Sequence, residues 1–353
     1  MVDALGSNSS SALVKNLLQL RKSMEGLERQ LATGKKSDTY GGLGPERSLS
    51  VSFRSGISRL ESYQSSITMV DLRLSVSDLV VTRISDIGVE ARAALDPNIY
   101  QLLGNGKTQG QATALNLLGE TLSLLNTDAG GRYLFAGQDV SNKPVESMNA
   151  ILDGDGSRAG FLQHKTERLL ADMGTNDTGR IDVAQPVPNQ VQLAEDGAHP
   201  FGFKMDTVNS NLSNVTVTGP SGSPSVLGID FTGQPLVGET LTLNLVLPDG
   251  SNHRIELSAA LAGQGGDGHF EIGATADDTA ANLAASLTTA LQNSGGIQLR
   301  TASGIAAGED FFNTDGGAAP QRIDGPPFAS ATALRDATEA DTVIWYKGEN
   351  NSS

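Results

Sequence analysis

The sequence of 353 residues contains no cysteine, four histidines, one tryptophan and only 5% aromatic residues. Without cysteine the chain has no disulfides, no thiolate catalysis and no cysteine-ligated metal. The histidines are scattered and form no i, i+4 pair, so the sequence holds no local zinc motif. Because ligand pockets are usually lined by aromatic side chains, their scarcity disfavours a deep pocket. We therefore predict no metal and no cofactor.

Basic charge and long apolar runs are also scarce. The net charge is −15; the first fifty residues carry seven Lys/Arg and five Asp/Glu, a net of +2, which leaves −17 for the remainder. This balance argues against nucleic-acid binding and against an anionic membrane surface. No apolar run approaches the roughly 18 residues of a membrane span, and the N-terminus does not resemble a cleaved secretory signal. We expect a cytoplasmic protein, or one exported without a cleavable signal.

The first recognisable element is a helix with a narrow apolar row. Its apolar residues alternate at spacings of four and three, and charged residues occupy the other faces. A row this narrow needs a partner helix, either in the same domain or in another subunit. The residues of the row are Leu13, Leu17, Leu20, Met24, Leu27 and Leu31.

A second, longer helix is predicted from about residue 46 to residue 95, ended by Asp96-Pro97-Asn98. Fifty helical residues make a rod of roughly 75 Å, an object typical of coiled coils and filament subunits. Ser77 and Gly88 weaken the apolar row without breaking its period. The main residues of the row are Leu60, Tyr63, Ile67, Val70, Leu74, Val81 and Ile84.

Further elements follow. A third helix is expected at residues 108–126, then a short strand in GRYLFAGQ, then a helix within residues 158–173 with Leu162, Leu169 and Met173 inward. From about residue 186 to 327 apolar and polar residues alternate as in β-strands, most clearly along residues 239–259.

This β-rich segment also contains a predicted helix at residues 277–293, capped by Asp277 or Asp278, with Leu283, Leu287 and Leu291 inward. Helical character is expected to return at residues 329–340, followed by a strand at residues 342–346. The segment is therefore predicted to be an inserted α+β domain.

The stretch LATGKKSDTYGGLG, residues 31–44, has the glycines and lysines of a phosphate-binding loop but not the required spacing. A Walker A motif would require glycine at Arg29 and serine or threonine at Lys36. The Gly42-x-Gly44 pair fails as a dinucleotide fingerprint, because Arg47 occupies the place of the third glycine. The stretch is predicted to be an elbow between two helices.

The elbow has matching helix-end signals: Gly34 suits the end of the first helix, and Pro45 suits the first turn of the next. Elsewhere DGDGS, at residues 153–157, begins like a calcium loop, but His164 occupies the position of the bidentate glutamate, which favours a plain turn. No nucleophile–base pair has local support, so we predict that the protein is not an enzyme.

Three stretches resemble the flagellin family of bacterial flagellar proteins. In residues 31–44, Leu31, Gly34 and Lys36 match the start of the family loop "LSSGxRINSAxDDAAG", with looser matches at Asp38 and Gly44, while the Arg-Ile-Asn core is absent. Residues 131–144, GRYLFAGQDVSNKP, are close to the family strand "GxYLFSG…P" in its hook-associated protein 3 form. The third stretch, VTRISDIGVEARAAL, is similar to "QRVRELAVQ" through Arg83, Ile84, Asp86, Ile87 and Val89.

The resemblance implies a structural protein of the bacterial flagellum, exported unfolded and assembled at the growing tip. In that family the terminal helices pair as a coiled coil, long helices form the inner tube and inserted domains face solvent. The implied partners are other flagellar axial proteins (the hook-side protein, flagellin and further copies of this chain) and an export chaperone, with no nucleic acid and no membrane insertion. The implied location is extracellular, in the secreted flagellum.

The expected fold is mainly α with an inserted α+β part: an elongated long-helix bundle, the flagellin-like core, with a mixed solvent-facing domain. The family also ends in a heptad helix that pairs with the first one; the chain stops at Ser353 without it, and we expect a trimmed chain rather than a natural short form. The expected domains are a polymerisation segment (1–47), a helical core with a short β-hairpin (48–185), the inserted domain (186–327) and a return segment truncated before that helix (328–353).

Three functions remain open on the sequence. A hook–filament junction protein is favoured by the form of residues 131–144; a filament flagellin is the alternative, and an adhesive or receptor-recognised surface module is a lower one. In flagellins the segment matching residues 81–89, including Arg83 and Ile87, is recognised by innate immune receptors. Ser85 replaces the second arginine of that motif, which implies weak or absent recognition.

Overall fold

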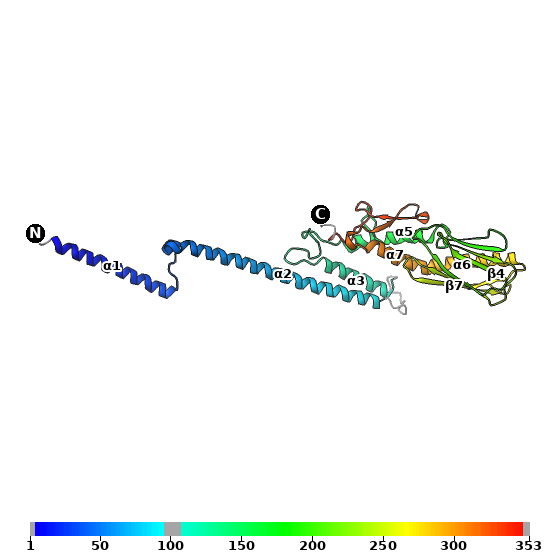
Figure 1. Cartoon of the computed structure of the whole chain (residues 1–353), viewed down its shortest axis with the longest axis horizontal. Coiled ribbons are helices and arrows are strands. Elements are labelled where there is room, and N and C mark those ends of the chain that lie inside the picture. Colours follow the sequence, from blue (N-terminus) through cyan, green and yellow to red (C-terminus); the bar gives the residue numbers. More distant parts are fainter. Residues whose placement is uncertain (1–3, 95–106, 349–353) are drawn as a thin grey trace. The chain divides into compact units, whose positions relative to one another are not determined.

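The computed structural model describes residues 4–94 and 107–348, and the chain divides into two compact units, residues 1–76 and 77–353 (Figure 1). The helix stop predicted at residues 96–98 lies outside the described residues. Helices and several β-sheets make the fold mixed α/β. The two units are described separately below.

The first unit contains α1 (Ala4–Thr33), the 3-10 helix η1 (Tyr40–Glu46) and the first part of α2 (Arg47–Ala93). Gly34 ends α1 with φ of 65°, and its N–H donates to the Gln30 carbonyl at 2.8 Å. An ion pair of 2.6 Å between Lys36 and Glu46 spans the turn. The predicted elbow is confirmed.

In the second unit the end of α2 lies beside α3 (Gln109–Leu125), which begins with a capping box formed by Thr108 and Gln111 (Figure 1). The strand predicted in GRYLFAGQ is wrong. Gly131 and Gly137 have φ of 73° and 61°, and the chain turns back so that the Tyr133 N–H donates to the Val140 carbonyl. Such positive φ angles favour a turn over an extended strand.

Two four-stranded sheets follow the short helices α4 (Met148–Asp153) and α5 (Phe161–Met173). The first sheet has the antiparallel order β1-β2-β5-β4, and the second the order β3-β6-β7-β8, in which only the β7–β8 pair is parallel. The strands are β1 (Ile181–Ala184), β2 (Gln190–Glu195), β3 (Lys204–Ser210), β4 (Val215–Ser221), β5 (Val226–Phe231), β6 (Thr240–Val246), β7 (Asn252–Ala260) and β8 (His269–Glu271).

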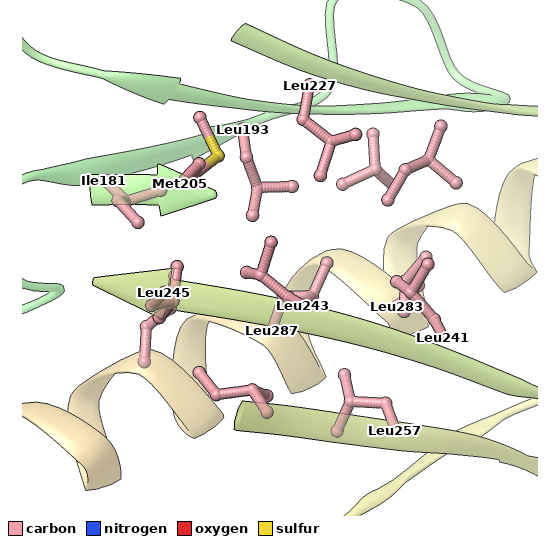
Figure 2. Close-up of a cluster of buried hydrophobic side chains, with 14 of the residues drawn as sticks. Ile181, Leu193, Met205, Leu227, Leu241, Leu243, Leu245, Leu257, Leu283 and Leu287 are labelled. Carbon is pink, nitrogen blue, oxygen red and sulfur yellow. The ribbon is translucent and has the colours of Figure 1, made fainter. Parts of the chain in front are cut away.

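The inner faces of both sheets share one core with α6 (Ala276–Ser294), as Figure 2 shows for Leu193 and Leu227, Leu243 and Leu257, and Leu287. The predicted alternation in β6 and the inward leucines of α6 are confirmed, since these side chains are at most 2% exposed apart from Leu247, at 6%. The cap of α6 is Thr275, which forms a capping box with Asp278, rather than Asp277 or Asp278 alone.

After α6 a π-helical turn, η2 (Gly295–Leu299), leads into α7 (Arg300–Phe312), which packs on α5. The remaining elements are η3 (Asp315–Gly317), β9 (Gln321–Ile323), η4 (Phe328–Ser330) and β10 (Leu334–Asp336).

The helix predicted at residues 329–340 is wrong, because this segment pairs β10 with β9. The strand predicted at residues 342–346 makes only isolated bridges, from Thr342 to Ala159 and from Tyr346 to Val145. Two expected domain boundaries also fall between paired strands: residue 186 lies between β1 and β2, and residues 327 and 328 lie between β9 and β10.

Candidate interaction surface

The apolar row of α1 lies in solvent. The least exposed of its six side chains, Met24, has 56% of its surface accessible, and the most exposed, Leu31, has 89%. Burying one such side chain contributes about 1.5–3 kcal/mol, so a row of six is a strong candidate for contact with another helix. We refer to Leu13, Leu17, Leu20, Met24, Leu27 and Leu31 as the α1 row.

The part of α2 in the first unit has a similar exposed row. Leu60, Tyr63, Ile67, Val70 and Leu74 are 50–66% exposed. The row continues upstream at the same spacing, and this extension was missed from the sequence although its period was readable. The two added residues are Phe53 and Ile57, 64% and 54% exposed.

In the second unit the row predicted for α2 is displaced around the helix. Val81 is 57% exposed and Ile84 is half-buried, whereas Val80 and Ile87 are 3% and 6% exposed. Val80 and Ile87 lie three residues before and four after Arg83, so they share its face of the helix. That face is turned toward α3, because Arg83 contacts Glu120 of α3.

Arg83 joins the two helices electrostatically. Its guanidinium donates to both carboxylate oxygens of Glu120, at 2.7 and 3.0 Å, and to Glu90 at 2.6 Å. The hydrogen bond from Arg83 lowers the pKa of Glu120, and the two glutamates raise the pKa of Arg83. Within the segment likened to the receptor-recognised one, Arg83 is therefore already paired and Ile87 is buried.

The buried face of α5 is largely charged, although an apolar face was predicted. Of the three residues predicted to point inward, Leu169 is half-buried and Met173 packs against the main core, but Leu162 is 43% exposed. Arg168 and Asp172 are 4% and 0% exposed and pair at 3.0 Å. Arg168 also pairs with Asp310 of α7 at 2.5 Å. Burial raises the pKa of both aspartates, and Arg168 opposes that rise. These are structural ion pairs, since each buried carboxylate is neutralised by an arginine.

A second buried group connects α5 to β9. Arg322 donates to both oxygens of Glu167, at 2.8 and 2.9 Å. His164 lies beside this pair, 4% exposed, with its ring 4.9 Å from that of Phe311. Burial, together with the positive charge of Arg322, lowers the pKa of His164 to about 4.

His164 should make the protein acid-sensitive. The folded state holds the ring neutral down to about pH 4, whereas an unfolded chain takes up the proton near pH 6.5. Stability from this group is therefore complete above pH 6.5 and decreases as the pH falls to 4, by on the order of 3 kcal/mol. When the free energy of unfolding in urea is measured across this pH range, His164→Gln should make its dependence on pH less steep. The exposed His269→Gln is the control, and equal slopes in His164→Gln and the natural chain would contradict the assignment.

The remaining candidate sites have structural explanations. Asp155 of the DGDGS stretch is bound by Arg158, whose hydrogen bond lowers the pKa of the aspartate to about 2. No group of three or more metal-ligating side chains occurs within residues 4–94 and 107–348. Among the helices of those same segments, none is both long and apolar enough to cross a membrane.

No family model, curated protein or solved structure matches the chain significantly. The main candidate site is the α1 row together with the exposed row of α2, because these are long helices with regularly spaced apolar side chains in solvent. Its function is inferred from the residues of this chain.

Proposed function

We propose that this protein is a structural subunit of the bacterial flagellum, most similar to a hook–filament junction protein of the hook-associated protein 3 type. It assembles through helix packing along α1 and α2, and the long-helix bundle forms with neighbouring subunits. Filament flagellin is the alternative within the same class. The observation that carries the proposal is the unpaired, heptad-spaced apolar row on α1.

Three further observations support the proposal. The row on α2 repeats the same spacing, so two long helices present apolar surface suited to partner helices. The ionisable groups buried around α5 are paired with one another, which suits a structural role better than acid–base catalysis. The three sequence stretches that resemble flagellins lie in the same N-terminal part of the chain. The partners under this proposal are other flagellar axial proteins and an export chaperone, and the location is extracellular.

Deleting the gene in its host tests the proposal. For a junction protein, electron microscopy should show hooks without filaments, and flagellin should appear in the medium. A plasmid copy of the natural gene should restore the filaments. Shortened filaments, or loss of one filament type on intact hooks, would favour filament flagellin; normal filaments and motility would contradict both.

A further inference from the structure

β7 has a free edge along most of its length. It spans Asn252–Ala260, but its neighbour β8 pairs only with Ser258, Ala259 and Ala260. Residues 252–257 are paired with β6 on one side, and no strand of the described residues pairs with them on the other. The unpaired backbone groups of such a strand edge are a template for another strand.

The direction of the backbone groups at this edge follows from the register. The Ala259 N–H donates toward β6, to the Glu239 carbonyl, at 2.8 Å, and the Ser258 N–H donates the opposite way, to the Gly268 carbonyl, at 2.9 Å. In an antiparallel pair these directions alternate along the strand. The N–H and C=O groups of Arg254 and Glu256 therefore point away from β6, where no described backbone group pairs with them.

The free edge borders a groove of about 490 Å³, formed by residues 253–257 of β7, residues 266–268 and one side of α6. The α6 wall consists of small or uncharged side chains, and His253 and Ser294, which are 2.9 Å apart, also line the groove. We call this the β7–α6 groove. The residues of its α6 wall are Ala285, Ser286, Thr289, Ala290 and Asn293.

The charges of the groove restrict its occupant. Arg254 and Glu256 contact each other and so largely neutralise one another. Burial lowers the pKa of His253, which keeps that ring neutral at neutral pH. Asp267 is then the unbalanced charge among the lining residues, and it disfavours an acidic occupant.

We propose that the β7–α6 groove binds an extended segment of another protein without acidic side chains, which adds as a strand to the free edge of β7. The unpaired amides and carbonyls at alternate residues select a peptide backbone, and the small side chains of α6 select small or β-branched side chains. Six residues of β7 offer an edge of about 20 Å. This site uses no residue of α1 or α2, so it is independent of the proposed helix-driven assembly.

The probe is the capped peptide acetyl-Ser-Val-Thr-Ala-Thr-Val-Ser-amide, titrated into the full chain. Amide hydrogen exchange should slow at Arg254 and Glu256 as the peptide saturates. N-methylation of alternate peptide residues should abolish binding in one register and leave it intact in the other, because only one set of N–H groups faces β7. Replacing the threonines by glutamates should weaken binding. Equal effects of both N-methylation registers, or no protection at millimolar peptide, would overturn the proposal.

Arg254→Pro removes an outward N–H without disturbing the ladder to β6, and it should weaken peptide binding at least about tenfold. Val217→Pro is a proline control at an outward position of the edge strand β4, which has no part in the groove. Its side chain packs at the margin of the main core, so the variant is compared at equal folded fraction, and it should leave binding unchanged. Thr289→Trp, which fills the groove from α6, should also abolish binding while circular dichroism stays unchanged. If Arg254→Pro and Val217→Pro weaken self-association of the full chain equally, the free edge of β7 pairs with β4 of a second copy. That result would overturn the proposal.

Discussion

Replacing Leu17 and Met24 with aspartate is expected to keep the protein monomeric at concentrations where the natural chain associates. Both residues belong to the α1 row, seven positions apart, and are 58% and 56% exposed. Each apolar side chain buried in a helix contact contributes about 2 kcal/mol, and each aspartate would add the cost of burying a carboxylate. Since 1.4 kcal/mol is a tenfold change, association should weaken by about a thousandfold or more. Sedimentation velocity over a concentration series measures this directly.

The same helix offers a matched control. Gln19→Asp with Gly26→Asp adds the same two charges, also seven residues apart, but on a face outside the α1 row. This control should associate like the natural chain. Equal loss in both double variants would mean that added charge, rather than the apolar row, governs association. Assembly that persists in Leu17→Asp/Met24→Asp would contradict the role given to α1.

Neither variant should alter the second unit, because α1 lies wholly in the first.

Amide hydrogen exchange measures the stability of α1 in the monomer and in the associated state. In a dilute monomer the amides of residues 13–31 should exchange rapidly, since a narrow apolar row without a partner does not stabilise a helix. In the associated state they should be protected. Slow exchange in the dilute monomer would show that α1 is stabilised within its own chain.

The sequence identified the elements whose apolar residues follow one period. α3 was predicted to within one residue at each end, and the inward leucines of α6 were predicted correctly. α7 was missed because its buried face consists mainly of alanine and serine, such as Ala302 and Ala306, which give no strong apolar period. Close packing on α5 and the fully buried Phe311 near its C-terminal end hold this helix.

Where the prediction failed, tertiary contacts outweighed local preference. The alanine-rich segment 329–340 has high helix propensity, yet β10 pairs with β9 and residues 328–330 pack near α5. In α5 all the buried residues except Ala171 are polar, and they recur with the helical period. Their partners Asp310 and Arg322 lie more than 140 residues away, so the sequence could not show that the face is buried.

The candidate site was predictable in part for the same reason. The heptad spacing of the α1 row is visible in the sequence. The face of α2 that meets α3 is not, because it depends on the ion pair between Arg83 and the distant Glu120. The free edge of β7 was not visible at all. It exists because β8 is only three residues long and pairs only with Ser258, Ala259 and Ala260.

Arg168→Met should destabilise the second unit strongly, with a loss of about 3–5 kcal/mol in the free energy of unfolding. The guanidinium of Arg168 pairs with the fully buried Asp172 and with Asp310, and it lies 5.3 Å from the ring centre of Phe201. Methionine preserves much of the volume but leaves both carboxylates without their cation. Urea unfolding followed by the fluorescence of Trp345 measures the loss.

Lys165→Met is the matched control, because Lys165 lies on the exposed side of α5 and its replacement removes one positive charge without burying a carboxylate. The control should change stability by less than about 0.5 kcal/mol. A similarly small effect of Arg168→Met would show that the two aspartates do not depend on the arginine.

The pH dependence separates lost charge pairing from lost packing. Burial already raises the pKa of Asp172 and Asp310, and removing Arg168 removes the charge that opposes this rise. In the variant these two carboxyls therefore bind protons in the folded state at a pH where the unfolded chain does not, so their own contribution to stability increases as the pH falls from 7 toward 4, while the His164 contribution changes equally in both proteins. The difference between Arg168→Met and the natural chain should shrink over that range. A difference that is constant with pH would instead assign the loss to packing against Phe201, because only an ionised carboxylate requires the arginine.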